Sequence, residues 1–238
     1  MTGKGIRIED LRKRYGSGDT AVDALKCVNM EVAPGEVVGL IGPSGSGKST
    51  LLKCLGAVID PSAGHMTLGD EVIYDGGWRV DDLRALRRDR IGFVFQAPYL
   101  IPFLDVTDNV ALLPMLAGMP NGEARARAID LLSALDVQHR AKAMPSQLSG
   151  GEQQRVAIAR GLVNQPPVIL ADEPTAPLDS ERAMAVIRIL NDMAKRYQTA
   201  IIVVTHDEKI IPTFKRLYHI RDGVTHEETG EGRAVELA

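Results

Sequence analysis

Two adjacent carboxylates, Asp172 and Glu173, end the apolar run PVILAD and are followed by a proline. Charged side chains are almost never fully buried without a partner, so their place at the end of a buried strand needs a reason. Carboxylates at a strand end can bind a divalent cation or accept a proton from water. The residue types alone also allow a solvated Asp-Glu-Pro turn.

A second group of residues has the spacing of a phosphate-binding loop, because GPSGSGKST fits the pattern G-x-x-x-x-G-K-[ST]. Its glycines let backbone N–H groups turn inward around an anion at a helix N-terminus. Lys48 would add a full positive charge and the Ser49 hydroxyl a ligand for Mg²⁺. A Gly/Ser loop that matches by chance is the alternative, but an apolar run before it and a helical pattern after it favour the phosphate loop. The candidate nucleotide-binding residues of this loop are Gly42, Pro43, Ser44, Gly45, Ser46, Gly47, Lys48, Ser49 and Thr50.

The carboxylates and the phosphate loop support each other, because ligands of open α/β sheets bind beyond the carboxyl ends of the strands. Asp172 would then face the metal ion, as the Walker-B aspartate of P-loop NTPases does. Glu173 would point in another direction and accept a proton from an attacking water. The presence of the phosphate loop favours this interpretation over the solvated turn.

A second candidate anion site lies in LSGGEQQR, residues 148–155. Ser149 and Glu152 have the S-x-x-E spacing of a capping box, so we expect a helix to begin here. A plain helix cap does not explain Gly150 and Gly151, since glycine in a helix costs about 1 kcal/mol relative to alanine. These glycines leave the first N–H groups of the helix open to an anion.

The elements that must position these residues are indicated by short β-branched runs that alternate with helical patterns. The runs at 36–42, 91–96, 167–172 and 199–206 predict a parallel sheet covered on both faces. The N-terminal runs GIRIEDLRKRY and MTLGDEVIY favour an antiparallel sheet. One helix is predicted over 180–197 from residues on a single face, Ala183, Ile187, Leu190, Ala194 and Tyr197. Between 97 and 165 only helices are predicted, with loops at Pro98, Pro102, Pro114, Pro120 and Pro145.

Composition restricts the class of protein further. The chain has 238 residues and a net charge of −3, and this slightly acidic balance argues against nucleic acid as a partner. The N-terminus has no apolar stretch typical of a signal peptide, and no run of about 18 apolar residues predicts a membrane span. If the chain serves a membrane, we expect another chain to supply the membrane part. Cys27 and Cys54 have no metal-binding spacing and are expected to be reduced.

The order GPSGSGKST, LSGGEQQR, ILADEP resembles that of the nucleotide-binding subunits of ABC transporters, over nearly the whole chain. The resemblance implies that Tyr15 in LRKRYG stacks on adenine and that Gln96 after GFVF touches Mg²⁺ and the permease-contact region. It also implies that His206 in IVVTHD contacts the γ-phosphate and that Asp179 in APLD crosses a dimer interface. Without the resemblance these four would be an edge-strand tyrosine, a polar strand end, a structural histidine and an ordinary aspartate.

The resemblance implies an α/β fold with a RecA-like P-loop NTPase core, an antiparallel N-terminal β subdomain and an inserted helical subdomain. We expect a single ABC ATPase domain over 1–238, with 1–96 and 166–238 forming the core and β subdomain and 97–165 the helical subdomain. ATP and Mg²⁺ are the implied cofactors. The implied catalytic residues are Glu173, His206 and Lys48, and the implied metal ligands are Ser49, Gln96 and Asp172. Besides the phosphate loop, the implied nucleotide-binding residues are Tyr15, Gln96, Ser149, Gly150, Gly151, Glu152 and Asp179.

The implied working unit contains two copies of the chain, because each motif occurs once. Each ATP would lie between the 42–50 loop of one copy and the 148–152 helix start of the other, in a homodimer that forms on ATP. The implied partner is an integral inner-membrane permease, with or without a periplasmic adaptor. The chain would then be a peripheral protein on the cytoplasmic face of that membrane.

The sequence departs from the family pattern at two places. Glu152 stands where many members have glutamine, and Ala176-Pro177 stands where small or polar residues are usual. Glu152 can still cap the helix, whereas a proline removes an N–H and restricts φ in the segment that ends at Asp179.

The motifs look closest to the branch of macrolide export and lipoprotein release, which includes glycolipid- and haem-export ATPases. One alternative is a cell-division-type member that regulates a periplasmic enzyme without transport. A second is a non-transport ATPase of DNA repair or translation. Members of that kind have a coiled-coil insert or tandem cassettes, and this chain has neither.

Overall fold

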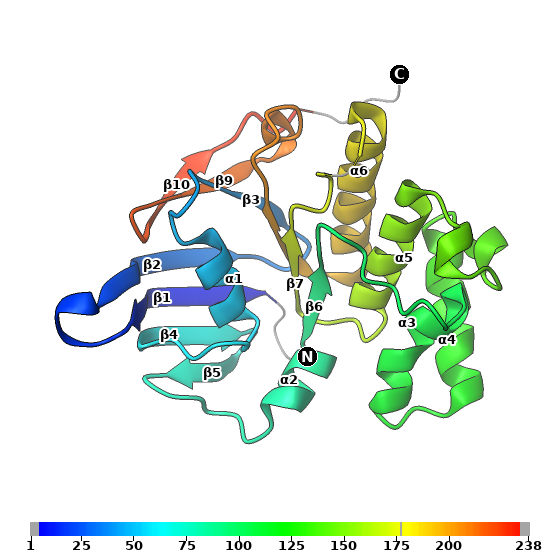
Figure 1. Cartoon of the computed structure of the whole chain (residues 1–238), viewed down its shortest axis with the longest axis horizontal. Helices are drawn as coiled ribbons and strands as arrows, with labels where there is room; N and C mark the ends of the chain where they lie inside the picture. The colour runs from blue at the N-terminus through cyan, green and yellow to red at the C-terminus, as the bar shows by residue number, and fades with distance from the viewer. Residues whose placement is uncertain (1–4, 177, 234–238) are drawn as a thin grey trace.

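The computed structural model describes residues 5–176 and 178–233, which form one sheet of ten strands with helices packed around it (Figure 1). Along the sheet the order is β5-β4-β1-β2-β10-β9-β3-β8-β7-β6. The antiparallel part comprises β1 (Ile6–Tyr15), β2 (Val22–Val32), β4 (Ala63–Leu68) and β5 (Glu71–Asp75). The parallel part comprises β3 (Val37–Ile41), β6 (Ile91–Val94), β7 (Val168–Asp172) and β8 (Ala200–Val204). These two parts confirm the predicted parallel core and N-terminal antiparallel sheet.

A hairpin near the C-terminus joins the two parts of the sheet. Strand β9 (Arg216–Arg221) pairs parallel with β3, and β10 (Val224–Thr229) pairs antiparallel with β9 and touches β2. The sequence patterns predicted no particular role for this segment, because its residues alternate in polarity and give no long apolar run.

The central parallel strands are buried on both faces, which is why they are uninterrupted apolar runs. On β7, Ile169 and Ala171 belong to the apolar cluster that contains α6 (Ser180–Tyr197). Val168 and Leu170 belong to the cluster on the other side, which contains α1 (Lys48–Leu55). Because successive side chains of a strand point to opposite faces, one five-residue strand anchors both layers. The helix predicted over 180–197 is confirmed with those bounds.

The segment between β6 and β7 is helical, as predicted, and lies to one side of the sheet (Figure 1, green). Its main helices are α3 (Val106–Leu116), α4 (Asn121–Ala134) and α5 (Gly150–Leu162). Helix α2 (Leu83–Asp89) lies outside this segment, just before β6. Short 3₁₀ turns lie at Gly18–Thr20, Gln138–Arg140, Pro145–Gln147 and Ile211–Thr213. None of the helices in the described ranges is long and apolar enough to cross a membrane.

Helix α3 corrects one sequence prediction, because Pro114 lies inside it and not in a loop. A proline within a helix removes one backbone hydrogen bond, here the one to the carbonyl four residues earlier. Val106, Val110 and Ala111 of α3 are fully buried, so tertiary packing holds the helix despite the proline. The helix then ends within three residues, where the Ala117 N–H donates to the Leu113 carbonyl.

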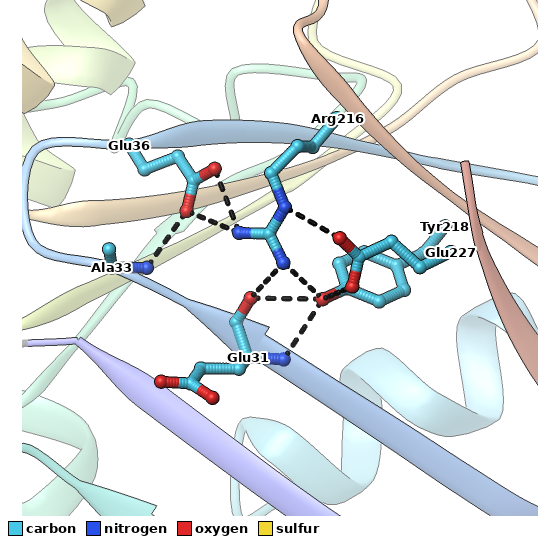
Figure 2. Close-up of polar contacts among 6 residues, drawn as sticks. All are labelled: Glu31, Ala33, Glu36, Arg216, Tyr218 and Glu227. Atoms are coloured by element: carbon cyan, nitrogen blue, oxygen red, sulfur yellow. Dashed lines mark hydrogen bonds and ion pairs between the residues drawn. The ribbon is translucent and has the colours of Figure 1, made fainter. Parts of the chain in front are cut away.

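A polar cluster around Arg216 fastens the hairpin to both parts of the sheet (Figure 2). The Arg216 guanidinium donates to both carboxylate oxygens of Glu36 at 2.9 and 2.8 Å and to Glu227 Oε1 at 2.9 Å. It also donates to the Glu31 carbonyl at 3.1 Å and the Tyr218 hydroxyl at 2.8 Å. The hydrogen bond to Glu227 and that to Glu36 raise the pKa of Arg216, and burial raises the pKa of Tyr218 to about 12. Arg216 of β9 is therefore a cation that links β2, β10 and the residue just before β3, an arrangement called the Arg216 clamp below.

We expect Arg216→Ala to lower the free energy of unfolding by about 2 kcal/mol, because it leaves the Glu36 and Glu227 carboxylates without their cation in a half-buried site. That loss corresponds to roughly 4–8 °C in Tm for a chain of this size, measurable by thermal denaturation. Arg7→Ala is the matched control, since its ion pair with Glu9 is exposed on both sides and is worth about 0.5 kcal/mol or less. Equal melting temperatures for the two variants would contradict the clamp.

Candidate functional site

Four neighbouring parallel strands end at one edge of the sheet, and each is followed by a predicted site residue. The 42–50 loop follows β3, His206 follows β8, and Gln96 follows β6. Asp172 is the last residue of β7 and Glu173 the next one along the chain. Because β3, β8, β7 and β6 are adjacent and parallel, their carboxyl ends bring these groups to a single edge.

The phosphate loop connects β3 to α1 and can hold its path only with glycines at its ends. Gly47 has a φ of 112°, a conformation that other residues rarely adopt. A Cβ atom on Gly42 would lie 2.2 Å from the Ile220 carbonyl oxygen, so the loop touches the backbone of β9. The predicted helix after the loop is present but ends at Leu55, sooner than its apolar pattern suggested.

The phosphate loop carries one cation and one buried hydroxyl, those of Lys48 and Ser46. Lys48 Nζ donates to the carbonyl oxygens of Gly42 at 2.7 Å and Pro43 at 2.8 Å. Ser46 Oγ is buried and makes no hydrogen bond to any described residue. A buried hydroxyl without a partner is uncommon in folded proteins. The loop therefore has a cation and a polar group available for an anionic ligand.

The two adjacent carboxylates, Asp172 and Glu173, differ in environment. Burial, and then the negative charge of Glu173, raise the pKa of Asp172 above its usual value. Glu173 adopts a left-handed conformation with a φ of 51°, while its N–H donates to the Val204 carbonyl at 3.0 Å. A left-handed non-glycine residue is uncommon and frequent at functional sites. This turn lets two adjacent carboxylates point in different directions.

His206 contacts the second of these carboxylates. Its Nδ1 lies 2.7 Å from Glu173 Oε1, so the imidazole donates to the carboxylate when that nitrogen carries the proton. The two residues come from neighbouring strand ends, 33 positions apart in the sequence. The histidine ring is about three-quarters exposed and the glutamate side chain is one-fifth exposed. The pair can accept a proton from a molecule that enters from solvent.

A cavity of about 310 Å³ beside the carboxylates brings Asp172 and Ser49 together. Its remaining lining is mainly apolar and includes Leu52, Phe93, Phe95 and Leu170. The Asp172 carboxylate and the Ser49 hydroxyl supply oxygen ligands in this mainly apolar cavity. Mg²⁺ binds such oxygens together with substrate phosphates. Within the described ranges, no group of three or more His, Cys, Asp or Glu side chains could hold a metal ion by itself.

The LSGGEQQR segment begins a helix, as its capping-box spacing predicted. Ser149 is the N-cap of α5, and its hydroxyl accepts from the Glu152 N–H at 3.3 Å while the Glu152 carboxylate accepts from the Ser149 N–H at 2.7 Å. A Cβ on Gly150 would meet nothing within 4 Å, so the helix start is open to solvent on that side. A cavity of about 420 Å³ beside it has no lining residue from the phosphate loop. Figure 1 shows α1 and α5 on opposite sides of β7, so one chain does not bring the two anion sites together.

Three further candidates, Tyr15, Asp179 and Gln96, lie at the surface. Tyr15, at the end of β1, is about two-fifths exposed, and Lys13 Nζ lies 5.0 Å from its ring centre. Asp179 is the N-cap of α6, because its carboxylate accepts from the Arg182 N–H at 2.9 Å. Gln96 is exposed. The prediction for Ala176-Pro177 concerns the backbone at Pro177, which lies outside the described residues.

Sequence reasoning missed three long-range contacts of α5. Arg140 Nε donates to Glu152 Oε1 at 2.7 Å. Gln154 donates to the Phe95 carbonyl at 3.3 Å, and Arg160 donates to the Pro98 and Tyr99 carbonyls. Gln154 and Arg160 tie α5 to the segment around Gln96; α5 begins in LSGGEQQR, called the signature motif below, and is called the signature helix. No local pattern marks such pairs, because the partners are 12 to 62 residues apart.

A phosphate loop after one parallel strand, with a carboxylate ending the strand two places along the sheet, defines the chain as a P-loop NTPase. Residues 25–176 match the ABC transporter family, and the chain belongs to this family. It is an ATP-binding and ATP-hydrolysing subunit of an ABC transporter.

Individual relatives agree with this assignment. The chain is 40% identical to the lipoprotein-releasing system ATP-binding protein LolD of Idiomarina loihiensis, over 97% of its own length and 100% of that protein. It is 43% identical to the macrolide export ATP-binding/permease protein MacB of Chromobacterium violaceum, but spans only 35% of that longer protein. A solved ATP-binding cassette, dimeric in a post-hydrolysis state bound to ADP and Pi, aligns with a TM-score of 0.81 at 38% identity, covering 96% of this chain and 99% of that one.

Proposed function

We propose that the chain binds ATP with Mg²⁺ in its phosphate loop and hydrolyses it with Glu173 as the general base. The observation that carries this proposal is the 2.7 Å contact between Glu173 and His206, beside Asp172 and on the same sheet edge as the loop. Lys48 binds the phosphates, His206 contacts the γ-phosphate and orients Glu173, and Tyr15 stacks on adenine. The experiment that tests the base is the Glu173→Gln variant described in the Discussion.

The donor set suits Mg²⁺. Asp172 and Ser49 line one cavity, and Gln96 at the end of the next strand would be a third ligand. Mg²⁺ prefers oxygen ligands and is commonly bound by one or two protein oxygens together with substrate phosphates. The raised pKa of Asp172 is the effect of burial that a neighbouring cation would reverse. When bound, Mg²⁺ would supply positive charge against the charge that develops on the phosphate oxygens.

The residues of the chain act around the attacking water. Glu173 takes a proton from the water while the water oxygen forms a bond to the γ-phosphorus, and the bond from that phosphorus to the bridging oxygen of ADP breaks. His206 keeps the carboxylate of Glu173 in place through its Nδ1. Lys48, which now contacts the Gly42 and Pro43 carbonyls, places its charge on the phosphates.

The second half of each ATP site comes from another copy of the chain. The start of α5 is open to solvent beside Gly150, and α5 lies on the other side of β7 from α1, the helix that follows the phosphate loop of the same chain (Figure 1). A helix N-terminus with free N–H groups favours a negatively charged ligand. In an ATP-dependent homodimer this helix start would face the γ-phosphate bound by the partner, with Asp179 at the interface. The dimeric state of the solved relative supports this arrangement.

A permease is the partner that best suits an apolar groove of about 770 Å³ between α2, α3, α5 and β6. Its apolar lining includes Phe95, Tyr99 and Leu116, and the side chains of four arginines also border it, Arg84, Arg87, Arg88 and Arg160. Tyr99 and Leu116 are each more than 60% exposed, and exposed apolar residues that gather in one groove usually mark an interaction site. The groove separates the proposed helical subdomain (97–165) from the core (1–96 and 166–238). Gln96 lies at the boundary, where permease contact and nucleotide could influence each other.

We expect Leu116→Arg to reduce membrane association roughly tenfold or more, because it replaces an exposed apolar side chain of the groove lining with a charged one. The measurement is the fraction of tagged chain that sediments with membranes of its source cell, followed by mass spectrometry of the integral membrane protein co-purified in detergent. ATP affinity should stay unchanged. Val72→Arg is the matched control, since Val72 is an exposed apolar residue on edge strand β5, outside the groove lining. Undiminished association of Leu116→Arg would contradict the docking site.

The names of LolD and MacB support transport of the macrolide-export or lipoprotein-release type. The resemblance of the motifs adds the haem type to this proposal, with the chain as a peripheral protein on the cytoplasmic face of the inner membrane. The same relatives do not favour the cell-division type. Reconstitution of the chain with its co-purified permease in vesicles separates the two functions. Movement of a substrate that also stimulates ATP hydrolysis supports transport, whereas stimulated hydrolysis without movement supports the regulator.

A further inference from the structure

The charge of Glu152 at the start of the signature helix needs a partner, because this side chain is only about one-tenth exposed. One carboxylate oxygen accepts from the Ser149 N–H at 2.7 Å, and the other accepts from Arg140 Nε at 2.7 Å. His139 Nε2 lies 3.4 Å from the second oxygen. The hydrogen bonds from Arg140 and from the Ser149 backbone lower the pKa of Glu152 to about 2, so the carboxylate is ionised at neutral pH. A buried charge of this kind depends strongly on its counter-ion.

Arg140 is well placed to fix Glu152 because its own backbone is anchored elsewhere. It ends the 3₁₀ turn Gln138–Arg140, and the carbonyls of Ala141 and Ala143 accept hydrogen bonds from the first N–H groups of α3 at 3.0 Å each. The segment that carries Arg140 is therefore held by α3 and not by α5. It forms an independent support against which the start of α5 can be oriented.

We infer that Arg140 is a positioning residue for the signature motif: through Glu152 it sets the orientation of Ser149 and of the first turn of α5 toward the partner's ATP. This inference rests on the proposed two-chain site. Arg140 does not need to touch the nucleotide, since its Nε is directed at the carboxylate of Glu152. A neutral glutamine at 152 could still accept the Ser149 N–H, so it would cap the helix without requiring the arginine.

A double-mutant cycle with Arg140→Gln and Glu152→Gln tests this inference. Arg140→Gln should lower kcat roughly ten- to hundredfold by misplacing the first turn of α5, with unchanged affinity of the monomer for a fluorescent ATP analogue. Glu152→Gln alone sets the reference turnover for a neutral cap. The double variant should turn over within about threefold of Glu152→Gln, because the unpaired carboxylate is then absent. Arg140→Lys, which keeps the charge, should recover part of the lost turnover.

Arg125→Gln is the matched control, because Arg125 pairs with Asp105 and Asp108 in the same helical region, and among the described residues none of its ion pairs or hydrogen bonds reaches α5. Its turnover should equal that of the unaltered chain. The inference is overturned if Arg140→Gln retains full turnover. It is also overturned if the double variant falls below Glu152→Gln by the same factor as Arg140→Gln falls below the unaltered chain. Ser149→Arg distinguishes failure of the Arg140 inference from failure of the proposed two-chain ATP site. If Ser149→Arg hydrolyses ATP normally, the two-chain site is wrong, whatever the result for Arg140.

Discussion

Glu173→Gln should retain ATP binding and lose hydrolysis by roughly 10²–10⁴-fold, the usual effect of removing a general base. Glutamine keeps the shape of the side chain and can still hydrogen-bond to His206, but it cannot take a proton from water at neutral pH. The phosphate loop is unchanged, so affinity should hold. Phosphate release measures turnover, and titration with a fluorescent ATP analogue measures binding.

Glu208→Gln is the control for this variant, since Glu208 is an exposed carboxylate two residues after His206 on the same edge of the molecule. It should hydrolyse ATP as the unaltered chain does. A decrease of less than about fivefold in Glu173→Gln would show that another group takes the proton, because general-base loss costs far more than that.

Ser149→Arg should abolish hydrolysis, by roughly 10²-fold or more, while the monomer still binds ATP. Arginine removes the cap of α5, which costs about 0.5–2 kcal/mol of local helix stability. It also places a long cationic side chain where the γ-phosphate of the partner's ATP must lie. Since α5, which Ser149 caps, lies on the other side of β7 from α1, the helix after the phosphate loop (Figure 1), monomer affinity should be unaffected.

Ser133→Arg is the control for the size and charge of the new side chain, because Ser133 is an exposed serine of α4 in the same helical segment. It should leave turnover unchanged. Loss of monomer ATP binding in Ser149→Arg, but not in Ser133→Arg, would instead mean that the signature acts within its own chain or supports its fold.

Local patterns predicted the part of the fold that positions the site. The parallel strands are buried on both faces, so each appears in the sequence as a short apolar run, and α6 has one apolar face with regular spacing. Helix α3 was not predicted because Pro114 normally marks a loop, and only the burial of Val106 and Val110 explains its survival inside a helix. The role of β9 and β10 depends on contacts such as Arg216 to Glu36, which are 180 residues apart.

In the candidate site, too, local features were predictable from the sequence and long-range contacts were not. Turn and cap chemistry acts over a few residues, so the phosphate loop and the Ser149–Glu152 capping box could be recognised from spacing alone. The contact between Glu173 and His206 depends on the order of strands in the sheet, which the sequence does not state. The pairing of Arg140 with Glu152 has no local pattern at all and needed the structure.

The central claim is that each ATP site is built from two chains, and mixing two inactive variants tests it most directly. Lys48→Ala removes the charge of the phosphate loop, and Ser149→Arg removes the signature, so each variant alone should be inactive. A mixed dimer has one site free of both changes, formed by the phosphate loop of the Ser149→Arg chain and the signature of the Lys48→Ala chain. Random pairing makes half of the dimers mixed, so an equimolar mixture should recover up to about a quarter of the unaltered ATPase rate. A mixture that hydrolyses no more ATP than the separate variants at any ratio would contradict the two-chain site.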